Sequence, residues 1–132
     1  MIDIENDVFN YVANALYAAY NSISIYGEPV EVPESFPSVS IVEDDNSEID
    51  SNVTLTREAE SACQLMYTVN TYSNKAKGKK TQAKEIMNLI DARMHDLGFV
   101  RTMRGQLPNV DRTVYRVTAR YTKIFQILEQ ED

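Results

Sequence analysis

Few of the side chains that usually perform catalysis or hold metals occur in this 132-residue chain. Its one histidine, His95, and its one cysteine, Cys63, cannot form a zinc-ligand set or an internal disulfide. Cys63 lies in the apolar stretch ACQLMYTV, which indicates a small buried residue rather than a nucleophile. His95 falls near the end of an expected helix, where its usual role is to offset the helix dipole. Neither residue predicts a catalytic centre.

Phosphate-binding and calcium-binding loops are also missing from the sequence. With four glycines in the whole chain, there is no Walker loop and no GxGxxG motif. The acidic run DDNSEID, residues 44–50, is similar in composition to a calcium loop, but it lacks the central glycine and the acidic residue at the twelfth position. No carboxylate is marked out by an apolar setting that would raise its pKa. We therefore expect no enzymatic activity, no metal and no cofactor.

Lysines are concentrated in one short stretch. The segment YSNKAKGKK, residues 72–80, contains Lys75, Lys77, Lys79 and Lys80. They precede or begin an expected helix, where the helix dipole disfavours each cation by roughly 0.3–1 kcal/mol. Because local stability does not require this placement, an acidic partner is a reasonable cause. A nucleic acid is one such partner, and an acidic protein surface is another.

The charge of the chain is divided between its two halves. Residues 1–60 hold 13 acidic residues and one basic residue, whereas residues 61–132 hold 7 acidic and 12 basic residues. Such asymmetry is typical of electrostatic partnering. Basic patches that bind nucleic acid usually come with aromatic platforms or a basic domain, but the pI of this chain is about 4.7. We therefore expect the lysines to contact acidic protein, either a partner or Glu43, Asp44 and Asp45 in a loop of the next copy.

Apolar stripes predict two helices that would position these charges. The first spans about residues 4–23 and has acids in its first turn, where the dipole favours them. Its stripe consists of Val8, Tyr11, Val12, Ala15, Leu16, Ala19 and Ile23. The second begins near Thr81 and is expected to end at Gly98. Its stripe consists of Ala83, Ile86, Met87, Ile90, Met94 and Leu97.

Alternating sequences predict strands between and after the helices. A proline-punctuated connector, residues 26–38, leads into the strand SVSIVED, and a mobile acidic loop is expected around 43–58. A long strand follows at about 60–72, with one face made of Cys63, Leu65, Tyr67, Val69 and Thr71. The strands FVRTMRGQ and RTVYRVTARYTKIFQ then form a hairpin around the turn LPNVD.

These elements predict a single α+β domain over residues 1–132, with the order α-β-β-α-β-β. An antiparallel sheet of about four strands would carry both helices on one face. The expected core consists of Val8, Val12, Leu16, Ile86, Ile90, Tyr115 and Val117. The other face would carry Arg116 and Arg120, with Arg101 beside them on the adjacent strand. A solvated face and a contact with a neighbouring subunit explain these arginines equally well.

The C-terminal half resembles the tail terminator, or tail completion, proteins of long-tailed bacteriophages. The resemblance covers residues 66–123. Its elements are a strand ending in Tyr-Ser, a lysine-rich start of the helix, a Leu-Gly-Phe sequence closing that helix, and a proline-containing turn before a strand with Tyr-Arg and Arg-Tyr pairs. These are residues 72–73, 75–80, 97–99, 107–111, 115–116 and 120–121.

This resemblance implies a non-enzymatic virion protein that forms a ring, in the family usually a hexamer. The ring caps the tail tube, stops its polymerisation and joins the tail to the head connector. The implied partners are further copies of the chain, the tail tube protein and the head–tail connector protein, while DNA passes through without specific binding. The implied location is the head-proximal end of the virion tail, after assembly in the host cytoplasm.

Under this interpretation, the charged residues named above would form the subunit or tail-tube interface. Two alternatives stay open. One is a head-side connector or stopper protein, and the other is a small nucleic-acid-binding regulator that uses the lysines. No apolar run approaches the length needed to cross a bilayer, so no membrane partner is expected.

Overall fold

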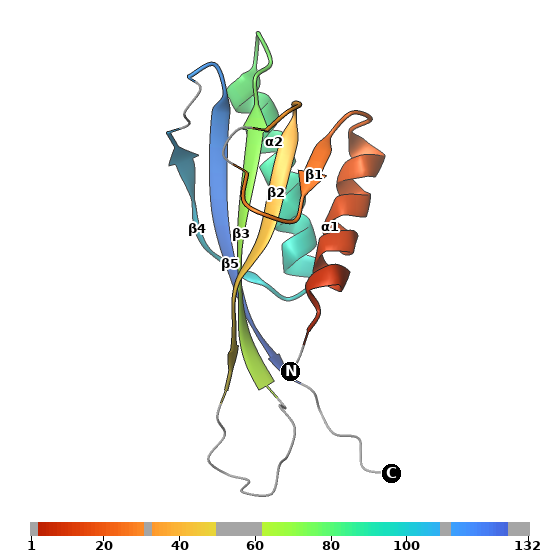
Figure 1. Ribbon diagram of the computed structural model, residues 1–132, viewed down its shortest axis with the longest axis vertical. Helices are drawn as coiled ribbons and strands as arrows, with labels where there is room; N and C mark the ends of the chain where they lie inside the picture. Colours follow the sequence, from red (N-terminus) through yellow and green to blue (C-terminus); the bar gives the residue numbers. More distant parts are fainter. Residues whose placement is uncertain (1–2, 31–32, 50–61, 109–111, 127–132) are drawn as a thin grey trace, which may run out of the picture.

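The computed structural model describes residues 3–30, 33–49, 62–108 and 112–126 as an α+β fold (Figure 1). Two helices and a five-stranded mixed sheet make up this part of the chain, so the predicted class is confirmed. None of its helices has the length and apolarity needed to cross a membrane.

Helix α1, Glu5–Ala19, is shorter than the predicted 4–23. Val8, Val12 and Leu16 of the predicted stripe are buried, whereas Tyr11 and Ala19 are exposed and that part of the prediction is wrong. The backbone becomes extended at Tyr20, where the helix has ended. Ile23 is buried, but it lies beyond the helix. The apolar pattern continued past the end of the helix because both segments face the same core.

Helix α2, Lys79–Asp96, begins two residues earlier than expected. Gly78 precedes it with a φ of 87°, a left-handed conformation that glycine adopts without steric cost. The buried residues of the helix are Ala83, Ile86, Met87, Ile90 and Met94. Gly98, also at φ 87°, follows its last turn, which confirms the predicted C-terminal end.

The sheet contains one strand more than predicted. Its strands are β1 Ser24–Tyr26, β2 Ser38–Glu48, β3 Ala62–Ser73, β4 Val100–Leu107 and β5 Tyr115–Gln126. Their order across the sheet is β1-β2-β3-β5-β4, with β1 parallel to β2 and the other neighbours antiparallel. The element order is therefore α-β-β-β-α-β-β, and the prediction of a four-stranded antiparallel sheet is wrong in this detail. The three residues of β1 are too few to show a strand period, and their pairing depends on the chain returning beside them.

The acidic run expected in a mobile loop lies partly in a strand. β2 continues through residues 43–48, each paired with β3 except at an irregularity between Glu43 and Asp45. Continuous backbone pairing with β3 supports this segment despite its acidic composition. Residues 50–58 of the predicted loop lie outside the described residues.

The core lies between the two helices and one face of the sheet. β3 contributes the five residues predicted for its inner face, and all five are buried. Of the seven predicted core residues, six are buried and Tyr115 is partly buried. The ring of Phe99 meets Tyr67 edge-on, with centroids 5.3 Å apart, and joins the end of α2 to this core.

The connector after β1 crosses the face of the sheet opposite α2 (Figure 1). Tyr72 of β3 donates a hydrogen bond from its hydroxyl to the carbonyl oxygen of Val30 at 2.9 Å. Four polar residues on this outer face are buried: Ser38, Ser40, Asn70 and Thr118. The outer face is therefore not a simple solvated surface.

Candidate interaction surface

Four lysines form one end of the molecule, which we call the lysine end: Lys75, Lys77, Lys79 and Lys80. They follow β3 or begin α2, and all except Lys79 are exposed. Lys79 donates from Nζ to the carbonyl oxygen of Thr113 at 3.3 Å. None of the ion pairs between described residues involves these lysines. Three of the four charges are therefore open to an external partner.

The three predicted acidic contacts do not form one patch. Glu43 lies opposite Tyr67, an inner-face residue, whereas Asp44 accepts a hydrogen bond from the Thr68 hydroxyl on the outer face. Asp45 accepts one from Ser47 Oγ at 2.6 Å. The irregularity in β2 divides the carboxylates between the two faces of the sheet.

Burial raises the pKa of the Glu43 carboxyl, and the nearby carboxylates of Glu5, Asp3 and Asp45 raise it further. Glu43 is half-buried, and its Oε1 atom is buried without a hydrogen-bond partner among the described residues. The same is true of the Tyr67 hydroxyl, which lies on the neighbouring strand. Burial, followed by the charge of Glu43, raises the pKa of Tyr67. Glu43 is thus a costly charge in the isolated chain.

The lysine end and the acids of β2 lie far apart in one subunit. Glu43 is opposite Tyr67, and six further residues of β3 lead to Ser73, where the strand ends. At 3.3 Å per residue, this separation is about 20 Å along the sheet. The two groups cannot meet within one copy, so any pairing between them would join different copies.

Arg116 and Arg120 lie on the outer face of the sheet, as predicted. Arg116 is partly buried and donates from Nε to Asn70 Oδ1 at 3.0 Å, and its guanidinium lies 5.6 Å from the centroid of the Tyr72 ring. Arg120 is exposed. The two arginines therefore differ: one is held in place by its neighbours, and the other is not enclosed.

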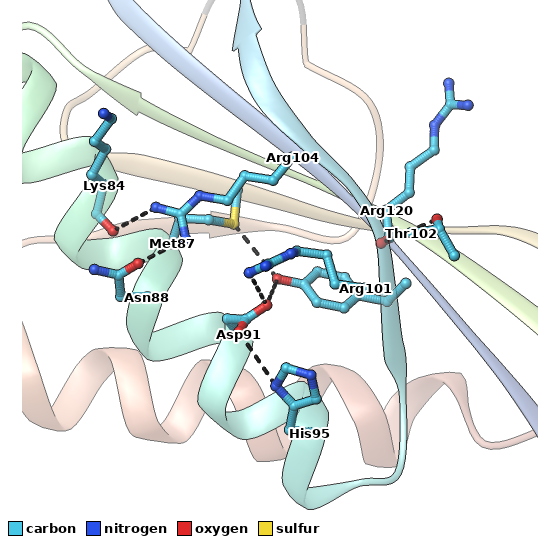
Figure 2. Close-up of polar contacts among 10 residues, drawn as sticks. Lys84, Met87, Asn88, Asp91, His95, Arg101, Thr102, Arg104 and Arg120 are labelled. Atoms are coloured by element: carbon cyan, nitrogen blue, oxygen red, sulfur yellow. Dashed lines mark hydrogen bonds and ion pairs between the residues drawn. The ribbon is translucent and has the colours of Figure 1, made fainter.

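Arg101 does not lie beside them, and that part of the prediction is wrong. In the register of the hairpin it is opposite Tyr121, an inner-face residue, and its Nη1 donates to Asp91 Oδ1 of α2 at 3.0 Å (Figure 2). The register of β4 shifts between Arg101 and Met103, which alternation alone does not reveal. A carboxylate on the flank of α2 gives the inward arginine a partner.

Asp91 joins α2 to the hairpin, a role that the sequence did not indicate. Besides Arg101, it accepts a hydrogen bond from the Tyr121 hydroxyl at 3.0 Å and lies 3.3 Å from Nδ1 of His95 (Figure 2). Burial and the Asp91 carboxylate raise the pKa of Tyr121. The one available signal was an acid flanking the apolar stripe of α2 together with an inward tyrosine, which usually needs a polar partner.

A second arginine of β4 also contacts α2. Arg104 Nη1 donates to Asn88 Oδ1 at 2.7 Å, and Nη2 donates to the carbonyl oxygen of Lys84 at 3.5 Å (Figure 2). Arg101 and Arg104 therefore fasten the outermost strand of the hairpin to the helix. This attachment holds β4 in place without a further strand beyond it.

The sheet leaves two strand edges unpaired within the described part of the chain. β4 is the last strand on one side, and on the other side β1 covers only residues 38–40 of β2. Residues 41–48 of β2 therefore expose an edge that carries Glu43, Asp44, Asp45 and Glu48. β4 carries Arg101 and Arg104 and has no acidic residue. The two edges have opposite charge.

The two edges also lie at the same height in the sheet. Arg101 of β4 pairs with Tyr121 of β5, which pairs with Tyr67 of β3, which pairs with Glu43 of β2. By the same steps across the sheet, Arg104 lies level with Ile41. Since each neighbouring pair between β2 and β4 is antiparallel, β4 runs opposite to β2. Two copies in the same orientation could therefore align β4 of one with β2 of the next as an antiparallel pair.

No group of three or more histidine, cysteine or carboxylate side chains that could hold a metal ion occurs among the described residues. Comparison of the sequence with models of known protein families and with curated proteins finds no match.

Proposed function

We propose that this chain is a non-enzymatic virion assembly protein of a long-tailed bacteriophage. Its copies form a ring, with six as the expected number, that caps the tail tube, stops its polymerisation and joins the tail to the head connector. The proposal comes from the resemblance of residues 66–123 to tail terminator proteins. The structural observation that supports it best is the pair of oppositely charged strand edges at one height of the sheet.

Unlike edges favour a head-to-tail assembly over a two-fold dimer. A heterologous contact repeats around a closed ring when the rotation between copies closes. Strand addition would give backbone hydrogen bonds to both edges, whose donors and acceptors are unpaired within the part of the chain that the structure describes. Glu43 would then lie beside Arg101, which turns to the same inner face and is shared with Asp91, and this pair would favour one register between copies.

In this assembly, the lysine end does not face the neighbouring copy. It lies beyond the end of β3, about 20 Å along the strand from Glu43. In a ring of level copies it would point along the ring axis rather than toward the next copy. Of the two partners expected for the lysines, this geometry favours the tail tube over the acidic strand of a neighbouring copy. A head-side connector ring would use the same edges, and only its place in the virion would differ.

The ring is tested by measuring oligomeric state while the β2 edge is changed. We expect native mass spectrometry and electron microscopy of the wild-type chain to show one discrete ring. The double variant Asp45→Lys with Glu48→Lys reverses two exposed charges of the edge and should give monomers. The control, Glu28→Lys with Glu34→Lys, reverses two exposed charges on the connector and should keep the ring.

The circular dichroism spectra of both variants should match that of the wild type, because all four positions are exposed. A wild-type chain that is monomeric or dimeric at every concentration would contradict the proposed ring. Equal loss of the ring in both double variants would assign the effect to net charge rather than to the β2 edge.

A further inference from the structure

A hollow of about 340 Å³ opens on the outer face of the sheet, between the connector and strands β2, β3 and β5. Pro29 and Val30 line one side of it, and the Tyr72–Val30 hydrogen bond holds that side against the sheet. This volume lies at the lower end of the range for pockets that bind small ligands. Val42 and Asp44 in its lining also belong to the β2 edge, whereas Arg116 lies on a central strand, so peptide binding at Arg116 is measured separately from ring formation.

The Arg116 guanidinium is held in a fixed position in this hollow, in a geometry suited to binding an anion. Asn70, which is 7% exposed, accepts from Arg116 Nε at 3.0 Å and donates from Nδ2 to the buried Ser40 hydroxyl at 3.4 Å. The guanidinium also lies against the Tyr72 ring. These contacts fix the side chain through one nitrogen and one ring face, and no contact among the described residues occupies its two Nη groups. An arginine held in this way loses little side-chain entropy when it binds a forked anion.

The hollow also contains a negative group. Asp44 lines it beside Thr68, whose hydroxyl donates to the Asp44 carboxylate. Val42 and Pro29 provide apolar lining between the two charges. A phosphodiester backbone would bring further negative charge toward Asp44, which disfavours a nucleic acid in this position. A ligand with one carboxylate and a nearby hydrogen-bond donor or cation matches both groups.

Chain dimensions indicate an extended peptide as the occupant. Arg116 is opposite Tyr72 in the sheet register, and Asp44 bonds Thr68, four residues earlier on β3. Four strand residues span about 13 Å between backbones. Because the long arginine side chain shortens the distance between the charges, residues two apart on an extended peptide, about 7 Å, can reach both.

We propose that this hollow binds a carboxylate carried by an extended peptide segment of a partner protein, with a lysine two positions away directed toward Asp44. The carboxylate lies on the Nη groups of Arg116, and the ammonium group lies on the Asp44 carboxylate. The carboxylate can come from an acidic side chain within the segment or from the end of a partner chain.

The test is a titration of the deuterated, ¹⁵N-labelled full chain, followed by amide chemical shifts in TROSY NMR spectra, which remain resolved for a ring of this size. The probe is the peptide acetyl-Ala-Glu-Ala-Lys-Ala-amide, and we expect saturable shifts at residues lining the hollow, including Val42 and Thr68. A peptide with Gln in place of Glu should bind about tenfold more weakly or not at all, because the charged hydrogen bonds to arginine are lost. The peptide acetyl-Ala-Lys-Ala with a free carboxyl terminus tests the second source of the carboxylate.

Three variants assign the binding to named groups. Arg116→Gln should abolish the shifts, whereas Arg120→Gln, an exposed change four residues along the same strand and face, should keep them. Asp44→Asn should keep binding of the carboxylate but remove the preference for lysine over alanine in the peptide. A dispersed NMR spectrum of each variant shows that it folds.

The proposal is overturned if the Gln peptide binds as well as the Glu peptide. It is also overturned if Arg116→Gln and Arg120→Gln weaken binding equally, because the site would then be diffuse. Inorganic phosphate that displaces the peptide at equal concentration would show a general anion site and contradict the selectivity for carboxylate. None of these results bears on the ring, which is measured by oligomeric state.

Discussion

Glu43 is the residue whose chemistry the fold changes most among the described carboxylates. Its half-buried position and the neighbouring acids raise its pKa above the ordinary 4.5. The folded chain therefore binds this proton more tightly than the unfolded chain does. The charge of Glu43 thus reduces stability at pH values above the folded-state pKa, and the penalty disappears as the pH falls below about 4.5.

We expect Glu43→Gln to raise the melting temperature at pH 7, because it removes an ionised group from a site that disfavours charge. Near pH 4 and below, the gain should vanish, since Glu43 itself is then largely protonated in both states. Thermal unfolding followed by circular dichroism at the two pH values measures this difference. Glu28→Gln, at an exposed position, is the control and should change neither value by much. A lower melting temperature for Glu43→Gln at pH 7 would show that the charge is stabilising.

At Gly98, the backbone conformation limits which side chains the position can accept. Its φ is +87°, and an added Cβ would lie 3.3 Å from the Cε and Nζ atoms of Lys123. Lys123 donates from Nζ to the carbonyl oxygen of Leu97 at 2.5 Å, so the crowded side chain also holds the end of α2. A non-glycine residue in this left-handed conformation costs about 1–2 kcal/mol.

We expect Gly98→Ala to lower the free energy of unfolding by about 1–2 kcal/mol or more in urea titrations. Two other glycines separate the causes. Gly78→Ala has the same φ but open space around the Cβ, so it should show the backbone cost alone. Gly105→Ala has neither problem and should stay within about 0.5 kcal/mol of the wild type. A cost at Gly98 equal to that at Gly105 would refute this account.

Among the elements, α2 makes the most varied contacts with the hairpin. Its apolar stripe packs on the inner face of the sheet, and its polar flank reaches β4 and β5 through Asp91, Asn88 and the carbonyl of Lys84. Polar contacts that are mostly exposed contribute little each, whereas full burial of an aliphatic side chain contributes more. The attachment of the helix should therefore depend chiefly on the stripe.

We expect Ile90→Ala to destabilise the domain by about 2–5 kcal/mol, because Ile90 is fully buried between α2 and the sheet. Arg104→Ala removes the bonds to Asn88 and Lys84 and should cost less than about 1.5 kcal/mol. Urea unfolding of the two variants gives both values. If Arg104→Ala cost more than Ile90→Ala, the polar flank would be the principal attachment of the helix.

At the scale of the whole molecule, charge is arranged along the sheet as well as across it. The lysine end lies at one end of β3, while the acids of β2 lie level with the arginines of β4. Under the proposed function, the edges build the ring and the lysine end meets the tail tube. Reversing the edge charges should therefore prevent ring formation, whereas reversing the lysine charges should prevent attachment to the tail tube.

We expect replacement of Lys75, Lys77, Lys79 and Lys80 by glutamate to leave the chain folded and the ring intact while blocking attachment to tail tubes. Exposed lysines act mainly through steering and registration, so wild-type attachment should also weaken as salt is raised. Electron microscopy of tubes mixed with each protein measures attachment. A gel-shift assay at physiological salt tests the alternative. Tight DNA binding by the wild type that the lysine changes abolish would contradict the tail-tube role and favour a nucleic-acid-binding regulator.

The sequence by itself determined the features that depend on local periodicity. The stripe of α2, the central part of the α1 stripe, the inner face of β3, the faces of β5 and the stop at Gly98 follow from side-chain spacing and from the conformational freedom of glycine. These features were enough to predict the α+β class and nearly the whole core. They also placed Arg116 and Arg120 on the outer face.

Only the tertiary structure decided the features that depend on which segments meet. The strand β1 and the acidic part of β2 exist because partner strands pair with them, and residue composition does not record pairing. Arg101 turned to the helix face because the register of the hairpin shifts beside it and Asp91 lies within reach. The hollow around Arg116 likewise needs the connector to cross the sheet. Such contacts join residues distant in the chain, so their geometry follows from packing rather than from local spacing.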